Sequence, residues 1–134
     1  MGKKYFCWSI DDGLEQDKKI VWILKESGMG ATFNLNSGMF GQKDMIGRIG
    51  NIGWKITSAE RYKKSHHFIK YTKSYRIPKD EVRQVYEGFE VASHGWHHND
   101  FRTASREKTK TSILQDKKNL EKIFGTAISG FAHL

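Results

Sequence analysis

Short β-favouring segments alternate with helical segments along this chain, and no other feature constrains its fold as strongly. We expect strands at residues 5–10, 31–35, 89–93 and 127–132, and helices at 17–27, 81–87 and about 105–124. Strands separated by a helix are best joined as right-handed parallel βαβ units, because the crossover needs the length of a helix. The sequence therefore predicts an α/β domain with a parallel sheet.

Local signals mark the limits of these elements. Asp17 is the expected N-cap of the first helix and Gly28 its C-terminal stop, and Asp80 is the expected N-cap of the second helix. The aromatic residues of segment 5–10 favour a buried strand, which the polar residues 11–13 bring to an end. The first two acids of the chain are therefore expected at the carboxyl end of a strand.

The length and composition fit one globular domain. The chain has 134 residues, of which 37% are hydrophobic and 28% charged, so we expect a single domain over residues 1–134 and exclude two. Its longest apolar run, residues 20–24, is far shorter than the roughly 20 residues of a membrane span. Residues 1–4 lead into no secretory leader, so we expect the chain as written to be cytoplasmic unless a leader has been removed.

A basic segment at about residues 41–78 lies between the second strand and the second helix. Its hydrophobic periodicity is weak and it is far longer than an ordinary connection, so we interpret it as an insertion or an irregular arm. Eleven lysines and arginines against four acids between residues 41 and 83 account for +7 of the formal net charge of +8. Interleaved aromatic residues could stack on sugars or bases, but a solvated arm is the commoner explanation, and no nucleic-acid partner is expected.

Acidic and histidine residues fall at the predicted strand ends, where parallel sheets place their chemistry. Asp11 and Asp12 follow the first strand, and His94 follows the third. His98 lies four residues after His94, so on one turn of helix or in a tight loop the two rings can share an ion. The lone cysteine, Cys7, leaves His, Asp and Glu as the available metal ligands.

Each of these features has an ordinary explanation when it is taken alone. Asp and Gly are common residues where a strand turns, and the histidine pairs 66–67 and 97–98 fit a solvated surface. For the pair 66–67 we adopt that explanation. The combination of acids and histidines at several strand ends is what favours a functional site.

Three stretches resemble motifs of the polysaccharide deacetylase family, the metal-dependent carbohydrate esterases that remove acetyl groups from N-acetylated sugars. WSIDDG is similar to the first motif, FEVASHGWHH to the second, in which a strand ends in H-x-x-x-H, and GTAISGFAHL to the start of the third. ILKESGMGATFNLN is similar to the helix and strand that connect the family's motifs. The resemblance covers most of the chain outside residues 41–78.

The resemblance implies a fold and roles for individual residues. The implied fold is about half of a distorted (β/α) barrel of seven or eight strands. Asp12, His94 and His98 become the ligands of a divalent metal ion, expected to be zinc, and Asp11 becomes the catalytic base. Trp96 is either a wall of the sugar site or a packing residue. The implied activity is hydrolysis of acetyl groups from an acetylated polysaccharide that is chitin-like or peptidoglycan-like.

The chain ends before two further motifs of the family, which supply an Asp that orients the base and a His that acts as general acid. We therefore expect weak or absent deacetylase activity from this chain alone, and name His97 and His133 as the alternative acids if it is active. Two other hypotheses are a remnant that binds metal or glycan without turnover, and a binder of anionic polymers through the basic segment. A parallel sheet with an open edge also predicts self-association.

Overall fold

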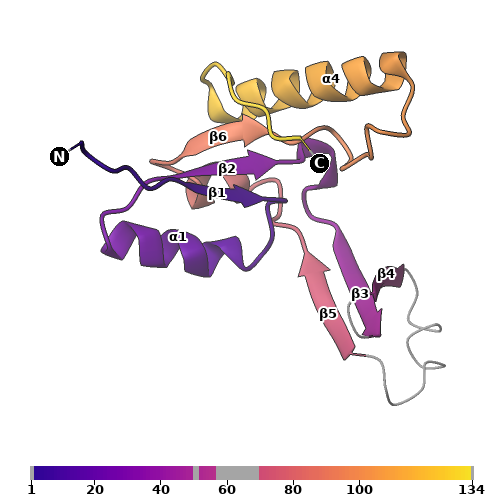
Figure 1. Ribbon diagram of the computed structural model, residues 1–134, viewed down its shortest axis with the longest axis horizontal. Helices are drawn as coiled ribbons and strands as arrows, with labels where there is room; N and C mark the ends of the chain where they lie inside the picture. The colour runs from indigo at the N-terminus through magenta and orange to yellow at the C-terminus, as the bar shows by residue number, and fades with distance from the viewer. Residues whose placement is uncertain (1, 50–51, 57–69, 134) are drawn as a thin grey trace.

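The computed structural model of the chain describes residues 2–49, 52–56 and 70–133 (Figure 1). The elements in chain order are β1 (Trp8–Asp11), α1 (Asp17–Glu26), β2 (Ala31–Leu35), the 3₁₀ helix η1 (Ser37–Met39), β3 (Lys43–Ile49), β4 (Ile52–Ile56), β5 (Lys70–Tyr75), α3 (Val82–Val85), β6 (Glu90–Ser93) and α4 (Arg106–Phe124). None of the described helices has the length and hydropathy that a membrane span requires.

A parallel sheet with the strand order β1-β2-β6 forms the centre of the fold. β1 pairs with β2 from Trp8↔Ala31 to Asp11↔Asn34, and β2 pairs with β6 through Leu35↔Ser93. Figure 1 shows α1 on one side of these strands and α4 on the other. The expected α/β architecture with a parallel sheet is confirmed, and the carboxyl ends of all three strands lie at one edge.

The expected fourth strand, at residues 127–132, is not a strand in the structure. This segment runs beside β6 but pairs with it through one parallel bridge, Ser93↔Phe131. Two backbone hydrogen bonds flank the bridge, from Ser93 N to Gly130 O at 3.0 Å and from Ala132 N to Ser93 O at 2.9 Å. A glycine fits here because a Cβ at position 130 would come within 2.8 Å of the Ala92 side chain. The close approach favours irregular backbone over a regular ladder.

The longest helix, α4, has a side-chain cap at its start and a glycine cap at its end. The Ser105 side chain accepts a hydrogen bond from the Lys108 backbone N–H at 3.3 Å, which satisfies one of the free donors at the helix start. Gly125 ends the helix in the left-handed conformation with φ +72°, where glycine carries no Cβ penalty. The expected helix at about 105–124 is thereby confirmed.

The expected N-caps of the two shorter helices were wrong, whereas Gly28 follows the C-cap of α1 with φ +62°, as expected of its C-terminal stop. α1 begins at Asp17 itself and its N-cap is Gln16, while Glu81 rather than Asp80 precedes α3. Asp17 is 2% exposed, and its carboxylate accepts a 2.6 Å hydrogen bond from the hydroxyl of Tyr86. The carboxylate accepts a hydrogen bond from the tyrosine that caps the C-terminus of α3, and not from the free backbone donors at the start of its own helix.

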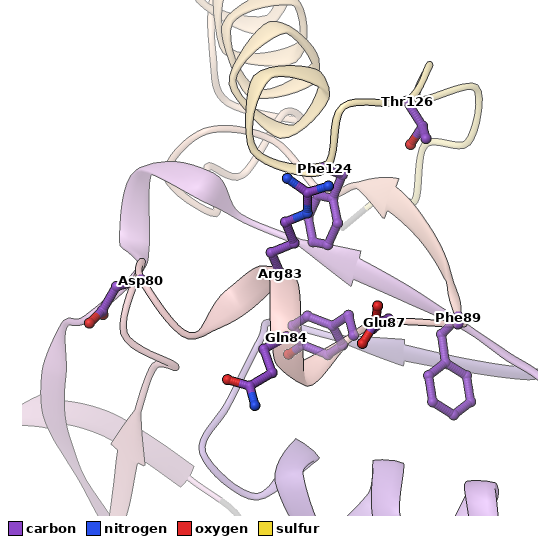
Figure 2. Close-up of a pocket in the computed structure, with 9 residues that line it drawn as sticks. Asp80, Arg83, Gln84, Glu87, Phe89, Phe124 and Thr126 are labelled. Atoms are coloured by element: carbon purple, nitrogen blue, oxygen red, sulfur yellow. The ribbon is translucent and has the colours of Figure 1, made fainter.

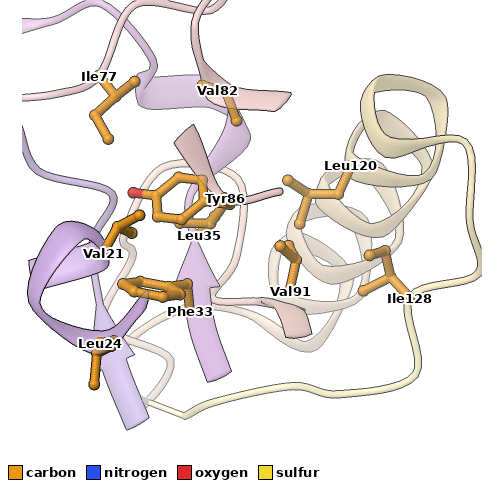
Figure 3. Packing of buried hydrophobic residues seen from close by; sticks show 10 residues of the cluster. All are labelled: Val21, Leu24, Phe33, Leu35, Ile77, Val82, Tyr86, Val91, Leu120 and Ile128. Atoms are coloured by element: carbon orange, nitrogen blue, oxygen red, sulfur yellow. The ribbon is translucent and has the colours of Figure 1, made fainter. Parts of the chain in front are cut away.

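The hydrophobic core lies between the parallel sheet and the helices that cover it (Figure 3). Phe33 and Leu35 of β2 are fully buried, and the ring of Tyr86 lies 4.7 Å from that of Phe33, centroid to centroid. Burial of such side chains contributes about 2 kcal/mol each, so the central strand anchors the fold. The buried hydrophobic cluster consists of Val21, Leu24, Phe33, Leu35, Ile77, Val82, Tyr86, Val91, Leu120 and Ile128.

The first strand is less buried than its sequence predicts. Trp8 is 44% exposed and only Ile10 of β1 reaches intermediate burial, while Tyr5 and Phe6 precede the strand and are 85% and 76% exposed. β1 lies at the edge of the described sheet, with β2 as its one strand neighbour. An apolar strand is therefore left at an open edge, as expected for part of a barrel.

The basic segment contains regular structure that its weak periodicity did not reveal. β3, β4 and β5 form an antiparallel sheet with the order β4-β3-β5. Figure 1 shows this sheet extending away from the parallel one. The prediction of an irregular arm is wrong for these strands, because the pairing of β3 with β5 joins residues too distant in sequence to leave a local pattern. Residues 50–51 and 57–69, with His66 and His67, lie outside the described part.

Candidate metal centre

Asp12, His94 and His98 converge at the carboxyl edge of the parallel sheet, as predicted. One donor atom of each residue lies within 4.8 Å of the other two. Asp12 Oδ1 is 3.1 Å from His98 Nε2 and 4.0 Å from His94 Nε2, and the two imidazole rings are 5.3 Å apart between centroids. Two imidazole nitrogens and one carboxylate oxygen form a donor set that suits a divalent transition metal.

The backbone around β2 places two of these residues. The N–H of Asp12 donates to the carbonyl oxygen of Asn34 at 2.9 Å, which extends the β1–β2 pairing by one bond. On the other side, the N–H of His94 donates to the carbonyl oxygen of Leu35, also at 2.9 Å. The central strand therefore fixes the spacing between Asp12 and His94, although they are 82 residues apart in sequence.

Two of the three candidate ligands have unusual backbone conformations. Asp12 has φ +87° and His98 has φ +54°, and they are the only non-glycine residues with positive φ in the described part of the chain. This region disfavours side chains and is held at a cost of about 1 kcal/mol or more per residue. Strained backbone of this kind clusters at functional sites.

Arg76 lies beside Asp12 and was missed as a site residue. The sequence placed it among the cations of a solvated arm, but it is 7% exposed and its Nη1 lies 3.3 Å from Asp12 Oδ1. The same Nη1 donates to the backbone carbonyl of Asp12. Burial acts to raise the pKa of Asp12, but the adjacent His98 and Arg76 groups outweigh it and hold that pKa at about 2.

The carboxylate of Asp12 fits a bound cation. Its Oδ1 is shielded from solvent and has no hydrogen-bond partner among the described residues, although His98 and Arg76 lie close to it. Buried polar atoms in proteins are nearly always satisfied, so an orphaned oxygen beside two imidazoles marks a place for a ligand.

Asp11, the predicted base, stands apart from the three converging donor atoms. Its side chain is exposed, and its Oδ1 accepts a 2.6 Å hydrogen bond from Asn34 Nδ2, which also donates to Ser9 Oγ at 2.8 Å. Asn34 is 2% exposed, so this amide is held in place. The structure therefore separates the two adjacent acids, with Asp12 facing the histidines and Asp11 facing the neighbouring strand.

Trp96 is a packing residue on at least one side. A Cβ at Gly38 would lie 2.4 Å from the Trp96 carbonyl oxygen and 2.7 Å from its indole, so only glycine allows this approach. Trp96 also lines a pocket of about 490 Å³ together with His97, Asn99 and residues of α4. Both functions that the sequence left open for Trp96 are compatible with this position.

One pocket lies away from these residues. It has a volume of about 550 Å³ and is formed by α3, the turn before β6 and the end of α4 (Figure 2). Arg83, Phe89 and Phe124 are among its lining residues, and none of the predicted site residues is. This pocket is therefore separate from the candidate metal centre.

The fold and the site define a class: an unclosed parallel α/β sheet that carries an Asp-His-His cluster at the carboxyl edge of its strands. The model of the polysaccharide deacetylase family matches residues 1–133. The chain belongs to the polysaccharide deacetylase family, as its sequence motifs indicated. A comparison with curated proteins found no significant match.

Solved structures of deacetylases share this fold. The deacetylase PplD of Streptococcus pyogenes, determined in complex with acetate, has a TM-score of 0.65 and 17% sequence identity. The match covers 96% of this chain and 46% of the PplD chain. The peptidoglycan deacetylase PdaC of Bacillus subtilis has a TM-score of 0.57 and 17% identity, with 98% of this chain and 50% of its own covered. A family 4 carbohydrate esterase of Bacillus anthracis has a TM-score of 0.56 and 18% identity, with 93% and 46% covered.

The chain thus spans half or less of the length of these three solved structures. The expected fold, part of a (β/α) barrel whose sheet is not closed, is confirmed.

Proposed function

We propose that this chain carries the metal-binding part of a polysaccharide deacetylase site, in which Asp12, His94 and His98 hold one divalent cation. The observation that carries the proposal is the convergence of their three donor atoms within 4.8 Å. Zinc is the ion we favour, because it accepts mixed imidazole and carboxylate ligands and catalytic zinc sites keep three protein ligands with one open position.

A cation at this position supplies Lewis-acid chemistry, since it polarises an acetyl carbonyl and acidifies water. Asp11 is the group we propose as proton acceptor, because its exposed carboxylate lies outside the donor cluster. Asn34 holds one oxygen of that carboxylate, which leaves the other available for the proton. His94 and His98 serve as ligands through Nε2 and take no part in proton transfer.

The proposed substrate is an N-acetylated sugar within a chitin-like or peptidoglycan-like polymer. Family membership supports an acetylated polysaccharide. The partly exposed Trp96 lies in the loop between the two histidine ligands and is the proposed sugar-contacting residue. Aromatic faces suit the apolar face of a pyranose ring.

We also propose that this chain alone deacetylates its substrate slowly or not at all. We take residues 1–134 as one domain that spans half or less of the related structures, so the groups that would act as general acid and orient Asp11 are not assigned within it. The alternative, binding of metal or glycan without any turnover, makes the same prediction for zinc and differs only in acetate release.

Two measurements test the proposal. Isothermal titration of the metal-free chain with zinc should give one site per chain, and absence of zinc binding would refute the metal centre. Acetate release from N-acetylated chitin oligomers then separates the two versions. Weak release that depends on Asp11 supports a deacetylase, whereas no release by the zinc-loaded chain supports the binding-only alternative.

We also propose that the exposed edge of β1 pairs with a second copy of the chain. Trp8 and Phe6 form an edge-to-face pair at 5.1 Å beside this edge, with Phe6 76% and Trp8 44% exposed. Open strand edges with apolar side chains readily pair with other strands. Light scattering should show a dimer or larger species, and a stable monomer at high concentration would contradict this.

The third hypothesis is that the basic segment binds anionic polymers. Part of this segment lies outside the residues that the structure describes. We do not favour this hypothesis. Binding of this kind should weaken steeply with salt, so a filter assay at two ionic strengths decides it.

A further inference from the structure

A buried carboxylate on α4 ties together the ends of two strands beside the candidate metal centre. Asp116 is fully buried, and its Oδ1 accepts a 2.7 Å hydrogen bond from the backbone N–H of Ser37 as well as a bond from the Ser37 hydroxyl. Its Oδ2 accepts a 2.6 Å bond from the hydroxyl of Ser93. Ser37 lies just beyond β2, and Ser93 is the last residue of β6.

The hydrogen bonds that this carboxylate accepts from the described residues all come from neutral donors. Removing a charge from water is costly, and three neutral hydrogen bonds return only part of that cost. An apolar residue at this helix position would pack at lower cost. A buried charge that bridges two strand ends therefore indicates a requirement on geometry.

The Ser93 hydroxyl passes this constraint to the ligand loop. Because it donates its one proton to Asp116, its lone pairs are left for the Gly95 N–H, which lies 3.4 Å away. Gly95 follows His94 and has φ +82°, which starts the turn that leads to His98. The orientation of a single hydroxyl thus joins α4 to the loop with both histidines.

A second contact from the same face of α4 supports the first. Ser112, one turn before Asp116, accepts a 2.9 Å hydrogen bond from the backbone N–H of Trp96. From the side of β2, the buried amide of Asn36 donates to the carbonyl oxygens of His94 and Gly95 at 2.7 and 2.8 Å. The loop is therefore fixed from both α4 and β2.

We propose that Asp116 is a positioning residue for the metal centre: by clamping Ser37 and Ser93, it sets the distance between the strand ends and thereby the geometry of His94 and His98. This inference rests on the proposed function, since Asp116 is proposed to act through residues beside the proposed ligands. Outer-shell partners of metal ligands commonly change metal affinity by about 10- to 100-fold when they are removed.

The test compares zinc affinity in matched variants by competition with a chromogenic chelator. Asp116→Ala and Ser93→Ala should each weaken zinc binding by about tenfold or more. Leu120→Ala is the control, because Leu120 is also fully buried on α4 but lies in the apolar core. It should lower the melting temperature while zinc affinity stays within about twofold, provided that affinities are measured where all variants are folded. Equal affinity in Asp116→Ala and the wild-type chain would overturn the inference, as would an equal loss in Leu120→Ala.

A second readout separates this inference from the metal proposal. In the metal-free chain, the ring resonances of His94 and His98 should shift in Asp116→Ala and stay in place in Leu120→Ala. If the wild-type chain binds no zinc but these shifts occur, the metal centre is refuted and the positioning role stands. If zinc binds, but Asp116→Ala changes neither the histidine resonances nor the zinc affinity, the positioning role of Asp116 is refuted and the metal centre stands. Should Asp116→Ala fail to fold, Asp116→Asn keeps the shape and one acceptor oxygen, and the same comparisons apply to it.

Discussion

The Nδ1 atom of His94 lies 2.9 Å from the backbone carbonyl oxygen of Ala132. A carbonyl can only accept a hydrogen bond, so Nδ1 carries the proton and the lone pair of the neutral ring is on Nε2, which faces Asp12. Ligating histidines in metalloproteins are commonly held in this way by a backbone carbonyl. The segment that follows α4 therefore leaves Nε2 of the buried His94 facing Asp12, as its proposed role as a ligand requires.

The first prediction concerns the ligands. His98→Ala should abolish stoichiometric zinc binding, because the remaining two donors cannot hold the ion at micromolar concentrations. His97→Ala is the matched control, since His97 is an exposed histidine of the same loop and lies outside the donor cluster. Calorimetry checks both variants, and unchanged zinc binding in His98→Ala would show that the ligand assignment is wrong.

Asp11→Asn should retain zinc with the affinity of the wild-type chain and lose any acetate release. The substitution removes the proton acceptor but keeps the shape of the side chain and leaves the three donors intact. Titration with zinc and an acetate assay on the same preparation check the two halves. Loss of zinc binding in this variant would instead make Asp11 a ligand.

Removal of the guanidinium beside Asp12 should destabilise the fold. Arg76→Met leaves a partly buried carboxylate without its cation and a backbone carbonyl without its donor, so we expect the free energy of unfolding to fall by about 2 kcal/mol. Arg83→Met, at an exposed position, should change it by less than about 0.5 kcal/mol. Urea denaturation of the metal-free proteins checks both values, and equal stabilities would contradict a structural role for Arg76.

The buried pair of Asp17 and Tyr86 predicts a pH dependence. Burial raises the pKa of Asp17 from 3.8 to about 6, although the Tyr86 hydroxyl acts in the opposite direction. Because the pKa is raised, the folded chain favours the protonated form of Asp17. The stability that this form contributes is complete below about pH 4 and is lost as the pH rises to about 6. Asp17→Asn has no such loss, so its stability relative to the wild-type chain should increase by about 3 kcal/mol from pH 4 to pH 7. A constant difference across that range would be incompatible with a raised pKa.

The contact of Gly38 with Trp96 predicts a cost for the smallest possible substitution. Gly38→Ala places a Cβ within 2.4 Å of the Trp96 carbonyl oxygen, so the loop that carries His98 must move. We expect a loss of stability of about 2 kcal/mol and weaker zinc binding. Gly30→Ala is the control, because nothing lies within 4 Å of the added methyl group and its φ is not in the left-handed region. Thermal unfolding and zinc titration should leave that variant close to wild type.

The sequence allowed a correct prediction of the parallel sheet and of the residues that meet at its edge. Strand and helix patterns are local, and the rule that parallel strands align their carboxyl ends brings Asp12 to His94 without any knowledge of the intervening chain. The loop spacing of His94 and His98 is also local. These parts of the site depend on short-range patterns and on one topological rule.

The contacts that support the site could not be predicted, because they depend on packing between distant segments. Arg76 was one cation in a basic stretch, and nothing in its neighbours distinguishes it from solvated lysines. Asp116 occupies a helix with many polar residues, so its burial follows only from the way α4 meets β6. The pairing of β3 with β5 is likewise set by partners distant in sequence.

Asp12 and His98 have the left-handed backbone that glycine adopts without a penalty. A glycine at either position would relieve roughly 1 kcal/mol of backbone strain and would remove a donor from the cluster. The most stable versions of these two loops are therefore not the versions that carry the full donor cluster. Selection for thermal stability alone should replace these residues, so a stabilised variant of the protein needs both positions held fixed during its design.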